Sequence, residues 1–257
     1  MSAARMNTEK MTNLAKQAEA NRERLAANPY PGRGIVLGRS EDGESWLQLY
    51  WIMGRSANSR NRRFAVEGNR LRTEPLDPAT LEHPELVIYT AMDEHAGQAV
   101  VTNGDHTDTV IEALRAGRDY RDALRTRERE PDAPNYTPRI AGGIDGGGVD
   151  GGGGAGWLAI LKADPGNPAR TVRAYYEFEA LEPGFGWCLT TYAGDGNPLP
   201  PYEGAPRPFP LPGGPESLAE AVWDLLNPEN RVALALKIMH PGAESSLTVI
   251  NAHQKAP

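Results

Sequence analysis

The sequence predicts an α+β fold, in which strands form two groups and helices lie between and around them. Short apolar runs bounded by glycine, proline or Asp-Gly turns occur in both halves of the chain, as expected for strands. Two neighbouring helical patterns separate the two groups, at residues 107–128. Strands and helices do not alternate regularly, so we expect a layered α+β domain rather than a parallel α/β fold.

The first predicted element is an amphipathic helix over residues 8–27. Its apolar residues fall roughly on one face and charged residues fill the rest. Asn28-Pro29 ends the helix. We expect residues 1–31 to form a helical arm that packs on the domain or on a neighbouring subunit, and residues 32–257 to form the domain itself.

The first group of strands follows this arm. The predicted strands are 34–38, 46–53, 62–66, 71–73, 86–92 and 98–102. Asp42-Gly43 is a hairpin signal between the first two. A helix over 107–116 comes next and ends at Gly117, and Asp119 is placed to cap a second helix that runs to Glu128.

The second group of strands closes the chain. The predicted elements are strands 139–144, 157–162, 171–180 and 186–192, a surface loop over 196–215, a helix over 216–226, and strands 231–239 and 247–251. The glycine-rich tract 142–156 lacks the Lys-Ser or Lys-Thr of a phosphate-binding loop and does not open a helix. We interpret it as a hairpin turn between two strands.

Composition limits the classes of partner. The net charge of −7 argues against a nucleic-acid-binding surface, and no apolar run approaches the ~18 residues of a membrane span. Cys188 is the single cysteine, which excludes an internal disulfide and fits a reducing compartment. The amino-terminal residues have no apolar signal core, so we expect a cytoplasmic protein.

A polar island, residues 103–109, lies where a strand ends and a helix begins. Backbone N–H groups at such a junction can hold an anion or a carbonyl oxygen. Two aspartates in the same turn oppose a phosphate. We therefore expect a neutral group, such as a carboxamide or a purine edge, to meet Asn103, Gly104 and Thr107. The alternative is plain helix capping by Asp105 or Thr107.

Two further runs carry arginine beside small polar residues. Arg55 and Arg60 flank hydroxyl and amide side chains that include Ser56, and arginine with hydroxyl groups on a strand-end loop suits a phosphate. A solvated loop is the alternative. Gly142 follows Arg139 closely and could permit a ligand to approach the strand.

Metal and nucleophile chemistry find little support in the sequence. The histidines are scattered, with no H-x-x-x-H and no Cys/His cluster, so we predict no metal site. No G-x-S-x-G is present, so a hydrolase nucleophile elbow is absent. His106 taken alone is more typical of a structural residue at a helix start than of a catalyst.

Three motifs in order carry a family resemblance. They are Gly54-Arg55-Ser56…Asn58-Ser59-Arg60, then Val100-Val101-Thr102-Asn103-Gly104-Asp105-His106-Thr107-Asp108-Thr109, then Thr137-Pro138-Arg139-Ile140-Ala141. From about Gly32 to the carboxyl end, the chain resembles the archaeal-type IMP cyclohydrolases. The resemblance implies a four-layer αββα sandwich similar to the N-terminal-nucleophile hydrolases, without their self-processing nucleophile. It also implies reversible closure of 5-formamidoimidazole-4-carboxamide ribonucleotide (FAICAR) to IMP and water, with no cofactor.

The same resemblance implies a set of site residues. Those implied as catalytic are Tyr89, Glu130, Asn103 and His106. Those implied to bind substrate are Arg55, Ser56, Arg60, Asn103, Gly104, Thr107, Arg139 and Gly142. Either Glu128 or Glu130 matches the acidic residue of the family, and we prefer Glu130.

Two other functions remain open at this stage. One is an amidohydrolase acting on another nucleotide-like amide, since one fold can host many amide chemistries. The other is a purine-nucleotide binding protein that has lost its catalytic acid. In each case the expected partner is a small nucleotide, and we expect the protein to bind neither nucleic acid nor a membrane. We also expect the protein to form a homo-oligomer.

Overall fold

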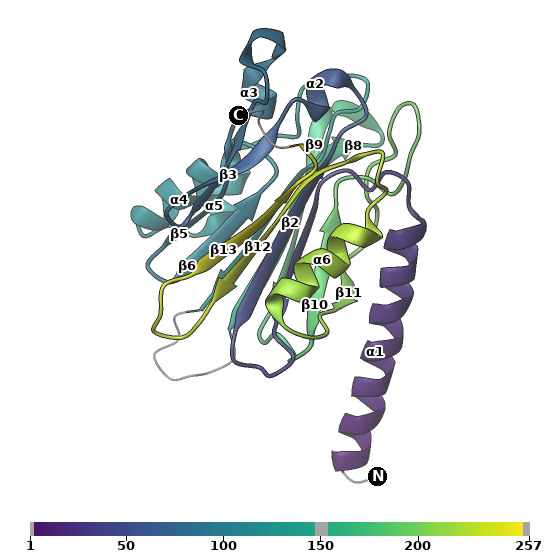
Figure 1. Ribbon diagram of the computed structural model, residues 1–257, viewed down its shortest axis with the longest axis vertical. Coiled ribbons are helices and arrows are strands. Elements are labelled where there is room, and N and C mark those ends of the chain that lie inside the picture. The colour runs from purple at the N-terminus through teal and green to yellow at the C-terminus, as the bar shows by residue number, and fades with distance from the viewer. Residues whose placement is uncertain (1–2, 147–153, 254–257) are drawn as a thin grey trace.

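A computed structural model describes residues 3–146 and 154–253 as two antiparallel sheets packed face to face, with helices on both outer faces (Figure 1). Sheet A has six strands in the order β11-β10-β1-β2-β12-β13 and sheet B has seven in the order β3-β4-β5-β6-β7-β8-β9. This is the four-layer αββα arrangement that the family resemblance implied, so the predicted fold class is confirmed.

The elements have the following bounds. Sheet A contains β1 (Gly34–Arg39), β2 (Trp46–Met53), β10 (Phe185–Thr190), β11 (Arg207–Pro210), β12 (Arg231–Met239) and β13 (Ser246–Asn251). Sheet B contains β3 (Arg63–Glu67), β4 (Arg70–Glu74), β5 (Thr90–His95), β6 (Gln98–Thr102), β7 (Arg139–Asp145), β8 (Ala155–Asp164) and β9 (Asn167–Phe178). The helices are α1 (Ala3–Ala27), α2 (Ala57–Arg60), α3 (Pro84–Val87), α4 (His106–Arg115), α5 (Tyr120–Arg125) and α6 (Pro215–Leu225), with a 3-10 turn at Pro78–Thr80.

Three apolar layers hold the sandwich together. The central layer fills the space between the sheets, the second lies between sheet A and the helices α1 and α6, and the third lies between sheet B and the helices α4 and α5. Strand β2 shows why the layers stack. All eight of its residues are buried, and Tyr50 and Ile52 face the central layer while Leu49 and Trp51 face the helices. A strand covered on both faces is mostly apolar, and the one polar side chain of β2, Gln48, donates to the carbonyl of Ala99 in sheet B (2.9 Å).

Helix α1 packs along β11 at the outer face of sheet A, and the N-terminal end of the helix projects past the body of the molecule (Figure 1). Leu25 anchors it in the second apolar layer. None of the described helices is long and apolar enough to cross a membrane.

Four expectations about local structure need correction or comment. The strand predicted over 86–92 begins only at Thr90, because residues 84–87 form a short helix before it. Pro84 occupies the first turn of this helix, and His83 before it adopts a left-handed conformation (φ 51°). Helix α5 ends at Arg125 instead of running to Glu128. The expected loop 196–215 contains the edge strand β11, in which Pro208 and Pro210 fit because one side of an edge strand needs no N–H donors. Strands β7 and β8 pair as a hairpin, and residues 147–153 of the glycine tract lie outside the described residues.

Candidate active site

The polar motifs meet at one end of the sandwich, which we call the motif end. There β2 and β6 end, β1, β5 and β7 begin, and β10 ends. Two contacts join the sheets at this end. The hydroxyl of Tyr50 in β2 lies 2.8 Å from that of Tyr89 before β5, and the hydroxyl of Tyr192 after β10 lies 2.7 Å from Oγ1 of Thr137 before β7.

A short loop places Glu130 at the motif end. The backbone N–H of Glu130 donates to the carbonyl of Thr137 (3.0 Å), and Asp132 accepts from both the backbone N–H (2.7 Å) and the hydroxyl (2.5 Å) of Thr137. The Glu130 side chain is 3% exposed. Burial raises the pKa of its carboxyl above the usual value, while Arg33 and Arg139 oppose that rise. Glu128, the alternative acid, lies on the surface.

Three guanidinium groups approach Glu130 from different elements. Arg33 precedes β1, Arg62 precedes β3 and Arg139 begins β7. Burial alone would lower the pKa of Arg33, but Glu130 and the tyrosines around it hold that pKa above its usual value. Burial and the charge of Arg33 lower the pKa of Arg62.

These arginines have donors that the protein leaves unused. The Nε atoms of Arg33, Arg62 and Arg139 are buried and have no hydrogen-bond partner. An unsatisfied buried donor costs about 1–3 kcal/mol, and more when the group is charged. The three arginines whose charges act on the Glu130 carboxyl therefore have donors to offer to a polar, electron-rich ligand at the motif end.

Asn103 joins the end of β6 to the start of β7. Its Oδ1 accepts the backbone N–H of Ile140 (2.8 Å) and its Nδ2 donates to the carbonyl of Pro138 (2.9 Å). The side chain is fully buried. Since its amide is already bonded on both atoms, Asn103 fixes the two strand ends relative to each other, and we do not place it on the substrate.

His106 is fully buried at the start of α4, with Nε2 3.0 Å from the carbonyl of Ile140. Burial, reinforced by the charge of Arg139, lowers the pKa of His106 to about 3. The ring is therefore neutral at physiological pH, with Nε2–H donating to Ile140 and Nδ1 facing Nη1 of Arg139 at 3.2 Å. The enclosed ring therefore lies directly against the Arg139 guanidinium.

Asp105 does not cap helix α4 with its side chain, so the capping alternative is wrong for this residue. Its carboxylate pairs instead with Arg139 (2.8 Å) and with Arg127. Thr107 also points inward, with its hydroxyl 2.7 Å from that of Thr102. The 103–107 motif thus forms an internally bonded support for the Arg139 guanidinium.

Gly104 allows that guanidinium to approach the chain. A Cβ at this position would lie 2.6 Å from Nη1 of Arg139. Gly142 has a different neighbourhood, because a Cβ there would lie 2.9 Å from Leu158 and 3.0 Å from Leu37 in the central apolar layer. The glycine at position 142 therefore serves the packing of the two sheets, and we leave it out of the site.

The other predicted binding residues lie on the rim of the motif end. Arg55 is exposed, pairs with Asp195 and lies 4.8 Å over the ring of Tyr30, which stacks on Tyr192. Arg60 donates to the carbonyl of Gly54 (2.9 Å). Ser56 caps the short helix α2 between them in a reciprocal capping box.

Sequence reasoning missed four residues of the motif end: Arg33, Tyr50, Arg62 and Tyr192. Each lies within or beside a strand that was predicted, but each reads locally as an ordinary strand or loop residue. The available signal was position, because Arg33 and Arg62 immediately precede strands at the end where the polar motifs gather. No group of three or more His, Cys, Asp or Glu that could hold a metal occurs among residues 3–146 and 154–253.

A family model described as "IMP cyclohydrolase-like protein" matches residues 30–243. The chain belongs to this family. Proteins named IMP cyclohydrolase are similar to it. The one from Methanosphaera stadtmanae is 32% identical over 63% of this chain and 73% of its own length. Those from Methanocella arvoryzae and Methanococcus maripaludis are 33% and 31% identical over 44% of this chain. The matched part of this chain spans 56% of the length of these last two relatives.

The family match covers most of the sandwich of this IMP cyclohydrolase-like protein. It includes every strand of the sandwich except β13, and all of the motif-end residues named above. It leaves out helix α1, which ends at Ala27.

Proposed function

We propose that this protein is an IMP cyclohydrolase, which closes FAICAR to IMP and water. One observation carries the proposal: Tyr89, Glu130 and three arginines with unpartnered buried Nε atoms converge at the motif end of a chain that belongs to the family. The names of the archaeal relatives support the same activity.

The reaction sets three physical requirements. The carboxamide nitrogen attacks the formyl carbon, forming the new C–N bond, and negative charge develops on the formyl oxygen. One proton leaves the carboxamide nitrogen and one leaves the formamide nitrogen, and both depart with the formyl oxygen as water. The site must fold the substrate, stabilise the oxygen and carry the protons.

In our proposal, Glu130 carries the protons. Burial raises the pKa of its carboxyl, which brings the group closer to the pH at which it can both accept and release a proton. The Arg33 guanidinium and the Tyr89 hydroxyl stabilise the formyl oxygen. Tyr50 holds the Tyr89 hydroxyl at 2.8 Å, and burial raises the pKa of Tyr50, so that Tyr50 stays protonated.

The substrate phosphate would lie away from the reacting atoms, toward the rim. We assign Arg55 and Arg60 to it, with Ser56 between them. Arg139, held by Asp105 and His106, would contact the base or its carboxamide. Asn103 and His106 support that arrangement without touching the substrate. Nucleotide binding, a homo-oligomer and a cytoplasmic location are further parts of the proposal.

The test mixes purified protein with FAICAR and follows purine absorbance. Glu130→Gln keeps size and removes the proton function, so it should lower kcat by about 100-fold or more with little change in KM. Glu128→Gln is the matched control, since Glu128 lies on the surface two residues away, and it should behave as the wild type. A wild-type rate for Glu130→Gln would overturn the assignment of the acid.

Arg60→Ala tests the division of labour within the site. Loss of one charge-assisted contact costs about 1.5–3 kcal/mol, so KM should rise by about ten-fold or more while kcat changes less. A variant with unchanged KM and a strongly lowered kcat would show that Arg60 acts on the reacting atoms instead.

A further inference from the structure

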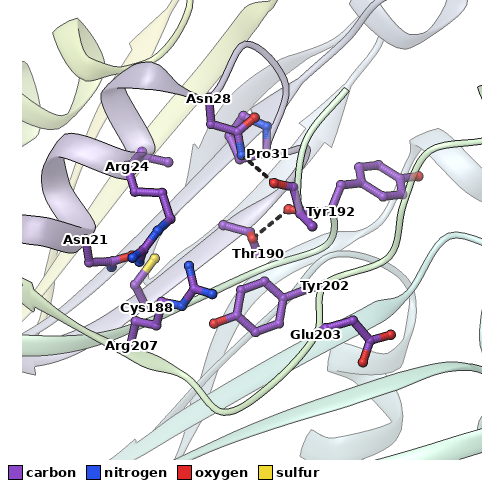
Figure 2. Close-up of a pocket in the computed structure, with 12 residues that line it drawn as sticks. Asn21, Arg24, Asn28, Pro31, Cys188, Thr190, Tyr192, Tyr202, Glu203 and Arg207 are labelled. Carbon is purple, nitrogen blue, oxygen red and sulfur yellow. Dashed lines mark hydrogen bonds between the residues drawn. The ribbon is translucent and has the colours of Figure 1, made fainter. Parts of the chain in front are cut away.

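A pocket of about 240 Å³ lies between the C-terminal half of α1 and the strands β10 and β11 (Figure 2). Helix α1 supplies Asn21 and Arg24, Asn28 directly follows the helix, and Cys188 and Arg207 come from the two strands. Because α1 lies outside the family match, the wall of the pocket that α1 forms lies outside that match, while the strand wall lies within it. It is separate from the candidate active site, although Tyr192 borders both.

Two arginines give the pocket its charge. Figure 2 shows the side chains of Arg24 and Arg207 converging on the same side of the pocket as Asn21 and Cys188. Among the ion pairs of the described residues, none includes Arg24 or Arg207. The Arg207 guanidinium lies 5.6 Å over the ring of Tyr202, which fixes its direction.

Asn21 provides a second, independent observation. It is 7% exposed, and its Nδ2 is buried and makes no hydrogen bond of ordinary geometry. The neighbouring Cys188 thiol is a weak acceptor, and burial raises its pKa to about 12, so it stays neutral. Arg24 approaches the other atom of the amide, Oδ1, at 3.5 Å. A buried amide whose donor meets only the weak thiol acceptor of Cys188 therefore lies beside two guanidinium groups.

The one acidic residue in the lining does not oppose an anion strongly. Glu203 pairs with Lys162 at 2.5 Å, and its side chain is 66% exposed at the rim. Lys162 offsets part of the carboxylate charge, because solvent screens an ion pair at the surface. The other carboxylate oxygen can accept a hydrogen bond from a hydroxyl group.

We propose that this pocket binds the phosphate group of a small sugar phosphate. Arg24, Arg207 and the Asn21 amide would donate to the phosphate oxygens, in the geometry that guanidinium groups offer to phosphate. Glu203 would accept a sugar hydroxyl, and Tyr202 would lie against the sugar. A volume of about 240 Å³ is smaller than the ~300–1,000 Å³ of sites for larger ligands, so a sugar phosphate fits better than a whole nucleotide.

The test is calorimetric titration of the full chain with ribose 5-phosphate and, separately, with inorganic phosphate. Arg24→Gln and Arg207→Gln should each weaken ribose 5-phosphate binding by about ten-fold or more. Arg22→Gln is the matched control, because Arg22 lies on the same helix and pairs with Glu19 outside the pocket. Arg60→Gln, which removes a rim arginine that we assign to the phosphate of the cyclohydrolase substrate, should leave this binding intact.

Four results would overturn the proposal. The first is no binding of ribose 5-phosphate to the wild type. The second is unchanged binding in Arg24→Gln and Arg207→Gln, and the third is equal weakening in Arg22→Gln. The fourth is inorganic phosphate binding as tightly as the ester, which would show that the sugar contributes nothing. Because the readout is binding alone, a failure here would leave the proposed cyclohydrolase activity untouched.

Discussion

Substitution of Gly104 by alanine tests whether the 103–107 motif acts by holding Arg139. The added Cβ would lie 2.6 Å from Nη1 of Arg139 and 3.3 Å from Nδ1 of His106. Comfortable non-bonded separations are ~3.5 Å, so the guanidinium must move by about 1 Å. His106 cannot yield, because it is fully buried and bonded to Ile140. The displacement therefore falls on Arg139 and its contact with Asp105.

A misplacement of about 1 Å at a positioned group can cost about 100-fold in rate. We expect Gly104→Ala to lower kcat/KM for FAICAR by that order. The cost in stability should stay within about 2 kcal/mol, since overpacking is partly offset by the lower entropy of the unfolded chain. The two effects are separated by measuring turnover and urea unfolding on the same preparation.

Gly214→Ala is the matched control, because a Cβ at Gly214 would meet nothing within 4 Å. This control should keep both its rate and its stability. If Gly104→Ala folds and keeps the wild-type kcat and KM, then Arg139 does not depend on this close approach, and the support role of the motif is refuted.

Two further predictions concern buried charge. The pKa of His106 is lowered from 6.5 to about 3 by burial, so the unfolded state binds the proton first. The resulting contribution to the free energy of unfolding is present above pH 6.5 and is lost as the pH falls from 6.5 toward 3. A plot of the free energy of urea unfolding against pH should therefore have a slope that is shallower by up to about 1.4 kcal/mol per pH unit in His106→Gln than in the wild type. Equal slopes would contradict the assigned pKa. Lys237 is fully buried and pairs with Glu94 at 2.6 Å, and Glu94 is 28% exposed. Glu94→Gln leaves a buried ammonium without its partner, so it should lower the free energy of unfolding at pH 7 by about 3–5 kcal/mol. Lys237→Met should lower it by less. The reverse order would show that the unpaired carboxylate costs more than the unpaired ammonium.

The sequence predicted most elements because their patterns are local. The strand 46–53 and the helix beginning near residue 107 were recovered almost to the residue, since an apolar run or a strand-to-helix junction depends on neighbours in the chain. The edge strand β11 was missed because its prolines are local loop signals, while pairing with β10 is a non-local fact.

The same division applies to the site. The family resemblance pointed to Tyr89, Glu130 and Arg139, and the structure brings all three to the motif end. The internal bonding of Asn103 and His106 could not be predicted, because both bond to the backbone of Ile140 in β7, more than thirty residues away. Sequence shows that an amide and an imidazole are present; only packing decides whether they face a ligand or a carbonyl.

Local patterns in the chain therefore predicted the α+β class, and the order of the polar motifs carried the resemblance that pointed to the family. The tertiary structure alone decided which arginines keep a buried Nε atom without a hydrogen-bond partner. Arg55, Arg60 and Arg62 belong to one basic run of the sequence, yet Arg55 and Arg60 lie on the rim, whereas Arg62, like Arg33, keeps such a buried Nε atom. The physical reason is that the cost of an unpaired donor depends on burial, and burial is set by strands that are distant in the chain.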